Sequence, residues 1–532
     1  MKKLGTLAIA VLAIAVSVPA QNVSSSVRGT ITDSSGASVV NADCTLTNQA
    51  TAGALAVKSG GDGGCTFPSV LPGTYTLTVR ATGFRNIQTK DIVVTSGQIR
   101  SLGQLSLEVG EVRETISITA EVSQIQLSSA EKSGSIDNAQ LQNIAVKGRD
   151  FFALLNTVPG VVDNFSQAGE TSSPDSIRGT FINGQRENQK NLAIDGITDL
   201  DTGSNSTVHF QPNMDAISEI KVLTSNYQAE FGRNGGGVIT VITKGGSKDF
   251  HGTGYWFYRH ESLNANSFFN NRNGTPKNPY RYRINGYSIG GPIFIPKTFN
   301  SNKEKLFFFW SQEYVGMKRD YGTRWSNMPT QLERDGDYSQ SFDSAGRLIV
   351  LRDPLTNASF PGNIIPKTRF SAMGLKMLNF FPLPNWRDPD PRELYNRNYR
   401  AQYSGAYPKR QDMIRVDANL TPSLQVYYRF IKDKDEQTVP WGLWVNGNLN
   451  YDLTPTIFGQ PGKGHNFHLT KVFGPTLINE FIFGKSRNNL YFYPKEPEKL
   501  DRGKIGNPPE WYKDSATGVT YLDKVNYIPN LT

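Results

Sequence analysis

Apolar and polar residues alternate in short runs along most of the chain, which is the pattern of β-strands with one buried face. In the first hundred residues these runs are separated by turn signals such as Pro72-Gly73, at intervals of about ten residues. Leu77 and Val79 alternate with threonines, so one face of that strand is expected to pack and the other to meet solvent. The pattern predicts a small β-sandwich over residues 22–110.

A second group of short apolar runs lies between Ile177 and Gly246, with Gly, Asn and Asp between them. Its one helical candidate is short, over Pro212–Ser218, where proline fits a first helical turn. We expect a small α+β domain over residues 123–249. Its predicted core consists of Ile182, Leu192, Ile194, Ile220, Val222, Val238, Ile239, Val241 and Ile242.

From about Phe250 aromatic residues dominate, and the runs become longer. Ile414 and Val416 alternate with Arg415 and Asp417, as expected of a strand between lipid and water. Backbone groups in hydrocarbon must all be paired, so such strands require a closed barrel. The alternative is the core of a soluble β-protein. About seven strands are predicted before Thr532, among them Leu306–Tyr314, Leu424–Asp433, His465–Phe473 and Leu477–Asn488.

Two features refine the prediction for residues 250–532. In the run from Leu306, Phe308 and Trp310 are expected to face outward, whereas Ser311 and Glu313 are expected to face inward. The polar segment 321–409 is rich in Pro, Asn and Asp, and we expect a long extracellular loop there.

Three sequence segments follow one another between Arg178 and Gly246: RGTFINGQR, NLAIDGITD and MDAISEIKVLTSNYQAEFGRNGGGVITVITKGG. They resemble the plug domain of TonB-dependent outer-membrane receptors, in particular the Oar-like branch. In that family the plug lies inside a large β-barrel. The phrases GTITDSSGASVVNA and FPSVLPGTYTLTV resemble the carboxypeptidase-regulatory-like domain, which has a carbohydrate-binding-like fold. That resemblance establishes neither sugar binding nor peptidase activity.

The resemblance therefore implies a mainly β protein: a β-sandwich, an α+β plug, and the first part of an antiparallel transmembrane β-barrel. Barrels that carry a plug have about 22 strands, and the final residues YIPNLT do not resemble a last barrel strand. We expect the barrel to be incomplete, in a fragment or a truncated gene.

A connector at residues 111–122 contains ETISITA, which alternates β-branched and polar residues. It resembles the TonB box that precedes the plug in the family, and an extended segment of this kind is suited to capture by β-augmentation. The alternative is the last strand of the first domain. The candidate TonB box consists of Glu114, Thr115, Ile116, Ser117, Ile118, Thr119 and Ala120.

Residues 1–20 have two lysines, an apolar run and small residues, which indicates a secretory signal cleaved between Ala20 and Gln21. The alternative is a retained anchor helix. After this segment no apolar run is long enough for a transmembrane helix. The net charge of +9 comes from dispersed Lys and Arg, so nucleic-acid binding is not expected.

Cys44 and Cys65 are the two cysteines of the chain, and an even pair in an oxidising compartment favours a disulfide over two buried thiols. No nucleophile with an adjacent base is found, and no catalytic, cofactor or metal site is predicted. His465 and His468 would point to opposite faces of a strand, so a shared metal is not expected.

The sequence therefore favours an energy-coupled outer-membrane receptor and transporter of a Gram-negative-type bacterium, not an enzyme. Its expected partners are a TonB-type protein in the periplasm, outer-membrane lipid and an unidentified extracellular ligand. The regulatory-like domain would lie in the periplasm. The alternative function is a surface adhesion or carbohydrate-binding β-protein without transport.

Overall fold

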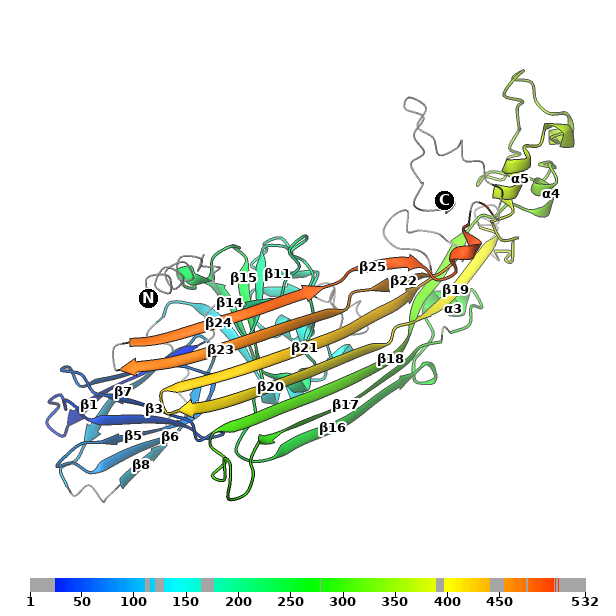
Figure 1. The fold of residues 1–532 in the computed structure, drawn as a ribbon. Coiled ribbons are helices and arrows are strands. Elements are labelled where there is room, and N and C mark those ends of the chain that lie inside the picture. Colours follow the sequence, from blue (N-terminus) through cyan, green and yellow to red (C-terminus); the bar gives the residue numbers. More distant parts are fainter. Residues whose placement is uncertain are drawn as a thin grey trace, which may run out of the picture.

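The structure is a computed structural model in which three units follow one another along the chain (Figure 1). They are an N-terminal sandwich, a middle domain (residues 129–249) and a long-stranded sheet (residues 250–501) that we call the wall. The signal-cleavage residues Ala20 and Gln21 lie outside the described residues. The structure describes residues 24–110, 115–119, 129–163, 177–277, 279–388, 397–440, 454–474, 477–501, 503 and 506.

The N-terminal sandwich consists of two sheets, with strand orders β4-β1-β7 and β3-β2-β5-β6-β8. Their inward side chains form one apolar core that includes Leu46, Phe67 and Leu77. Tyr75, Leu77 and Val79 are buried and the threonines between them are half-buried, as the alternation predicts. The strands are β1 Ser25–Asp33, β2 Asp43–Asn48, β3 Ala54–Lys58, β4 Gly64–Val70, β5 Gly73–Arg80, β6 Asn86–Val94, β7 Ile99–Leu107 and β8 Thr115–Thr119.

The middle domain is built on a mixed sheet with strand order β13-β12-β15-β14-β9, in which β12 and β15 are parallel. Every residue of β12 and β15 is buried, because the sheet is covered on both faces. Its strands are β9 Lys132–Asp137, β10 Val161–Asp163, β11 Thr180–Ile182, β12 Lys190–Ile194, β13 Ile197–Thr198, β14 Ile217–Ser225 and β15 Gly237–Thr243.

The helices of the middle domain are short, and α2 Asn138–Asn143 begins with a capping box between Asp137 and Gln140. The helix expected over Pro212–Ser218 is a single turn, η3 Met214–Ala216, because β14 begins at Ile217. The other turns are η1 Lys147–Arg149, η2 Phe151–Thr157 and η4 Ala229–Phe231.

The wall is an antiparallel sheet that curves past the middle domain, which lies behind it in Figure 1. Among the described residues it does not close into a barrel, since β16 at one edge has a single neighbour, β17. Its strands are β16 His251–His260, β17 Arg281–Pro292, β18 Leu306–Ser326, β19 Tyr399–Ala406, β20 Lys409–Thr421, β21 Leu424–Val439, β22 Thr456–Gly459, β23 Gly462–Gly474, β24 Leu477–Asn488 and β25 Tyr491–Pro494.

The two ends of the wall differ in the length of their connections. Residues 422–423 join β20 to β21 at the end where the sandwich lies, whereas residues 327–398 join β18 to β19 at the opposite end (Figure 1). Transmembrane barrels have short periplasmic turns and long extracellular loops, so the sandwich lies at the end with periplasmic character.

The long connection is shorter than the expected segment 321–409. Strand β18 continues to Ser326, and its last part pairs with β19, which ends before β20 begins at Lys409. Both ends of the expected loop are therefore strands, and the connection itself is limited to residues 327–398. The connection carries α4 Gln331–Arg334, η6 Pro361–Asn363, η7 Lys367–Arg369 and α5 Ala372–Leu378; elsewhere the wall carries η5 Glu261–Leu263, α3 Phe268–Arg272 and η9 Pro497–Lys499.

Side chains of the wall follow the predicted alternation. Ser311 and Glu313 are buried on the inner face, whereas Phe308 and Trp310 lie on the opposite face and are partly exposed. None of the helices in the described ranges has the length and apolar character needed to cross a membrane.

Candidate functional site

The inner face of the wall is joined to the middle domain by buried polar contacts, the central one being an ion pair. Asp195 and Gly196 form the two-residue turn between β12 and β13, with φ of 49° and 82°. Positive φ at both positions is typical of the Asp-Gly type I′ hairpin. The turn presents the Asp195 carboxylate to Arg429 of β21, with Oδ2 2.9 Å from Nε, and both side chains are 1% exposed.

This ion pair is supported by further hydrogen bonds. The hydroxyl and backbone N–H of Thr243 donate to the Asp195 carboxylate, each over 2.8 Å. Asn466 of β23 donates to the Asp195 carbonyl over 2.8 Å, and Arg415 of β20 donates to the Thr243 carbonyl over 3.1 Å. Three neighbouring wall strands therefore hold the same corner of the middle domain. These bonds satisfy the Asp195 side of the pair, whereas Arg429 donates one hydrogen bond, from Nη2 to the Ile194 carbonyl over 3.3 Å, and its Nη1 has no hydrogen-bond partner among the described residues.

A second contact centres on Arg149, which has φ of 52° in the middle domain. Its guanidinium lies 2.7 Å from the Asp215 carboxylate of the same domain and 3.4 Å from Glu313 of β18. The same guanidinium stacks on the Tyr255 ring at 4.4 Å, while the Tyr255 hydroxyl donates to Glu313 over 2.8 Å. One cation thus connects the middle domain to two wall strands.

Glycines of the wall leave room for side chains of the middle domain. A Cβ atom at Gly464 would overlap the ring of Phe210, and one at Gly484 would overlap Ile197. Gly462 lies directly against the carbonyl of His209, so no side chain fits there. These close approaches require glycine because the backbone and the packed ring occupy the space of a Cβ.

Asp199 lies beside these contacts; its backbone N–H donates to the Leu192 carbonyl over 3.1 Å, and its carbonyl accepts from the His209 N–H over 2.8 Å. Its side chain is fully buried, and among the described residues neither carboxylate oxygen has a hydrogen-bond partner. Burial raises the pKa of Asp199 well above its ordinary value, and the opposite charge of Arg429 only partly offsets this. The contact therefore contains a carboxyl group that favours its neutral form.

The sandwich also contacts the middle domain. The backbone N–H of Lys248 donates to the Ala50 carbonyl over 2.8 Å. The Lys221 ammonium lies 2.7 Å from the Glu131 carboxylate and 3.4 Å from the Gly97 carbonyl of the sandwich. Burial raises the pKa of Glu219, whose carboxylate accepts the backbone N–H of Ser96 over 3.3 Å. These bonds fix the sandwich at the short-turn end of the wall.

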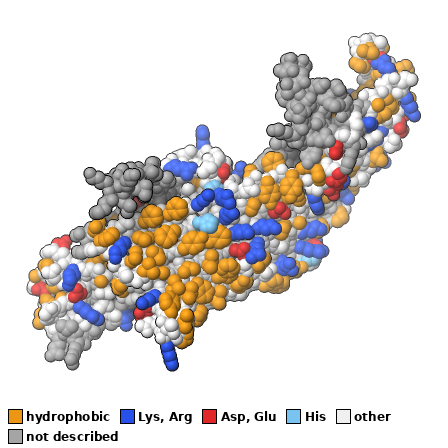
Figure 2. All heavy atoms as spheres, viewed as in Figure 1, with side chains coloured by type: hydrophobic (Ala, Val, Ile, Leu, Met, Phe, Trp, Pro, Cys, Tyr) orange, Lys and Arg blue, Asp and Glu red, His pale blue; other side chains and the backbone are white. Residues whose placement is uncertain are grey.

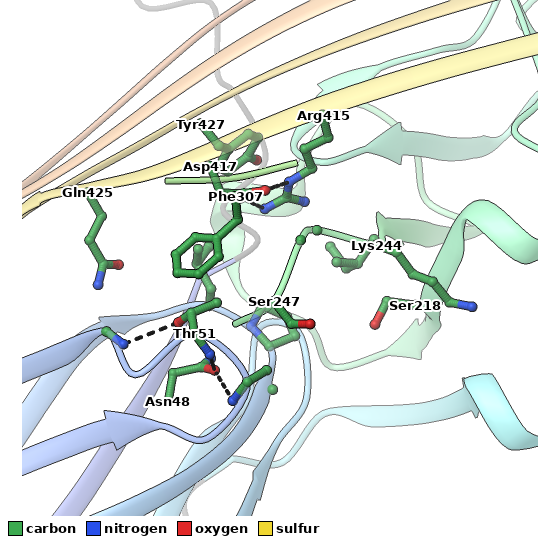
Figure 3. Close-up of a pocket in the computed structure, with 18 of the residues that line it drawn as sticks. Asn48, Thr51, Ser218, Lys244, Ser247, Phe307, Arg415, Asp417, Gln425 and Tyr427 are labelled. Atoms are coloured by element: carbon green, nitrogen blue, oxygen red, sulfur yellow. Dashed lines mark hydrogen bonds and ion pairs between the residues drawn. The ribbon is translucent and has the colours of Figure 1, made fainter. Parts of the chain in front are cut away.

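A cavity of about 530 Å³ lies where the three units meet (Figure 3). Asn48 and Thr51 line it from the sandwich, Ser218 and Lys244 from the middle domain, and Tyr427 from the wall. The Arg415–Asp417 ion pair, 2.8 Å long and partly buried, closes its wall side. In the described part of the chain no group of three or more His, Cys, Asp or Glu residues is arranged to hold a metal.

The predicted site residues lie apart from this contact. Thr115–Thr119 form β8, which pairs in parallel with β6 at the edge of the sandwich, the alternative position that the sequence left open. Glu114 and Ala120 lie outside the described residues. Cys44 and Cys65 form a disulfide that joins β2 of one sandwich sheet to β4 of the other.

Sequence reasoning did not single out the residues of the contact itself. The Asp-Gly hairpin signal identifies Asp195 as a turn residue, and the alternation along β21 places Arg429 on the inner face. No local sequence pattern shows that these two residues, 234 positions apart, form a pair. Arg149 carries no comparable signal. His465 and His468 lie on opposite faces as predicted: the first bonds Tyr428 on the outside, and the second contacts Glu480 at 2.7 Å.

Comparison with known families matches all three units. Residues 242–530 match the family described as "Outer membrane beta barrel domain". Residues 26–108 match "Carboxypeptidase regulatory-like domain", and residues 126–239 match "TonB-dependent Receptor Plug Domain".

Among curated proteins, the TonB-dependent transporter Oar of Myxococcus xanthus is 26% identical over 305 residues, which cover 54% of this chain and 26% of that protein. The chain spans about a quarter of the length of this relative. The outer membrane transporter YddB of Escherichia coli has a TM-score of 0.42 at 12% identity, with 68% of this chain and 40% of that chain covered. The siderophore receptor PirA of Acinetobacter baumannii has a TM-score of 0.32 at 14% identity, with 67% and 47% covered.

Proposed function

Because the chain belongs to the outer-membrane β-barrel family, as an Oar-like TonB-dependent receptor with an N-terminal regulatory-like domain, we propose that it serves energy-coupled passage of a large substrate across the outer membrane. The wall lies in the outer membrane and the middle domain is the plug. The work proposed for it is binding and passage, not catalysis.

The observation that carries this proposal is the polar contact between plug and wall. Asp195, Arg429 and Arg149 bond the plug to the inner face, beside apolar contacts of the plug core with Phe309, Met413 and Ile431 of the wall. Polar bonds exchange readily with water, whereas a continuous apolar interface would have to expose its surface. The polar part of this contact can therefore exchange its bonds for water when the plug moves under a pull.

The pull would reach the plug through Glu114–Ala120, which precede it in the chain. A TonB-type protein would capture this segment by adding its own strand to it. In the structure Thr115–Thr119 are paired with β6, so capture requires β8 to leave the sandwich or to use its second edge, which has no strand partner among the described residues.

The test compares binding of a purified periplasmic TonB domain to the full chain and to two double variants. Ile116→Pro with Ile118→Pro removes two backbone N–H donors and prevents strand pairing. Ile116→Val with Ile118→Val keeps both donors and the β-branched shape. We expect at least about a tenfold weaker binding for the proline variant alone, measured by calorimetry. Equal binding of all three proteins would exclude this segment as the coupling site.

A further inference from the structure

Strand β21 separates charges of opposite sign between the two faces of the wall. Its residues 432–435 read Lys-Asp-Lys-Asp, and successive side chains of a strand point to opposite faces. Lys432 and Lys434 are exposed on the outer face, where Figure 2 shows Lys and Arg side chains beyond the hydrophobic area nearer the sandwich. Asp433 and Asp435 are buried on the inner face. These carboxylates therefore point away from the lysines of their own strand.

The cations on the inner side of β21 already have carboxylate partners. The Lys409 ammonium lies 3.1 Å from the Asp435 carboxylate, and both side chains are almost completely buried. The Arg429 guanidinium lies 2.9 Å from the Asp195 carboxylate. Each of these two cations is thus neutralised by a carboxylate of its own.

Two further carboxyls, Asp199 of the plug and Asp433 of the wall, have no partner of this kind. Both side chains are almost completely buried, and among the described residues none of their carboxylate oxygens accepts a hydrogen bond. The His209 N–H donates to the Asp199 carbonyl over 2.8 Å, and the His209 carbonyl lies against Gly462, which is directly opposite Asp433. The negative charge of Asp433 also contributes to the raised pKa of Asp199. The two carboxyls therefore lie close together across the plug–wall contact.

Two buried amide oxygens lie in the same region. Gln411 of β20 is directly opposite Asp433, and its side chain is also buried on the inner face. Gln211 of the plug is fully buried, and its Nε2 donates to the Asp150 carboxylate over 2.8 Å. In the described part of the chain neither glutamine Oε1 has a hydrogen-bond partner. The contact therefore contains four carboxylate oxygens and two amide oxygens without a donor.

Unpaired carboxylates are costly in a dry contact, so such groups either take up protons or bind a cation. Two protons would satisfy at most two of the acceptor oxygens, whereas one hard cation binds several at once. Carboxylate and amide oxygens are the ligands of Ca²⁺, which takes about six to eight of them in a flexible arrangement. The amide oxygens complete a set with only two acidic residues, in agreement with the absence of a larger metal-binding group among the described residues.

We propose that Asp199, Asp433, Gln411 and Gln211 form a Ca²⁺ site that joins the plug to the inner face of the wall. The cation neutralises both carboxylates and supplies the missing partner of the amide oxygens. Because two ligands come from the plug and two from the wall, the cation binds the assembled contact and stabilises the folded chain.

The experiment uses the full chain in a neutral detergent, stripped of metal by a chelator and then given CaCl₂ or MgCl₂. The test variant combines Asp199→Asn and Asp433→Asn, which keep the shape of both side chains. The control combines Asp91→Asn and Asp249→Asn, with the same change in charge at exposed positions. The readouts are the midpoint of thermal unfolding and the calcium retained per chain after gel filtration, measured by elemental mass spectrometry.

We expect CaCl₂ to raise the midpoint of the wild type and of the control by several degrees, with about one Ca²⁺ retained per chain. MgCl₂ should have a smaller effect, because Mg²⁺ gives up its water ligands reluctantly. The test variant should bind Ca²⁺ at least about a hundredfold more weakly. Its midpoint in the chelator should equal or exceed that of the wild type, because two unpaired buried charges are gone.

Two results would overturn the proposal. A wild-type midpoint that does not respond to CaCl₂ would show that protons neutralise the two carboxyls, and an equal response of the test variant would place the cation elsewhere. If the test variant does not fold, Gln411→Met removes one amide oxygen at similar volume. It should weaken Ca²⁺ binding at least about fivefold and leave the midpoint in the chelator unchanged, and equal Ca²⁺ affinity of this variant and the wild type would then contradict the site.

Discussion

At the scale of single residues, the attachment of the plug depends on whether each buried charge keeps its partner. Asp195 and Arg429 are both almost completely inaccessible to water. An ion left alone in such a place loses its solvation without compensation, whereas a pair removed together leaves no uncompensated charge. The effects of single substitutions at Asp195 and Arg429 on the free energy of unfolding are therefore expected to be strongly non-additive.

We predict that Asp195→Asn and Arg429→Gln each destabilise the protein by about 3–5 kcal/mol, because each leaves a buried partner unpaired. The double variant should lose less than the sum of the two. The measurement is a double-mutant cycle on the midpoint of urea unfolding in detergent. Asp43→Asn, in the exposed pair with Lys58, serves as control and should change stability by about 0–1 kcal/mol. Additive effects at Asp195 and Arg429 would contradict the prediction.

At the scale of elements, the sequence predicted which face of a strand a side chain occupies better than where that strand ends. The inward positions of Ser311 and Glu313 follow from alternation alone, because successive side chains of a strand point to opposite faces whatever the rest of the chain does. The pairing of β8 with β6, and of β18 with β19, depends on distant segments that no local pattern identifies. For the same reason the polar contact between plug and wall could not be predicted from the sequence.

Strand β23 offers a test with its control on the same element. Gly462→Ala should push the plug away from the wall, because the added carbon overlaps the His209 carbonyl, a backbone atom that cannot rotate aside. Gly474→Ala adds the same carbon where no atom lies within 4 Å. We expect faster proteolysis of the plug in the first variant and an unchanged rate in the second. Equal rates in the two variants would show that plug and wall are not in contact at this glycine.

At the scale of the whole molecule, the sandwich lies beneath the wall and contacts the plug through few bonds. A pair of cysteines can report this arrangement in the intact chain. Lys248 donates its backbone N–H to Ala50, so the two positions lie within the reach of a disulfide. The native bridge between Cys44 and Cys65 lies within the sandwich and does not cross this boundary.

We predict that Ala50→Cys with Lys248→Cys forms a cross-link under mild oxidation, detected as a change in electrophoretic mobility that a reductant reverses. Each single variant should show no such change. If the double variant stays uncross-linked while both thiols react with a maleimide, the sandwich does not rest against the plug in solution.

Because residues 120–128 join the sandwich covalently to the plug, their association is intramolecular. A short tether of this kind corresponds to an effective concentration of about millimolar. A contact with a dissociation constant below about millimolar therefore stays formed while the tether is intact. Severing the chain between them would therefore weaken the association of sandwich and plug without altering a single bond in the contact.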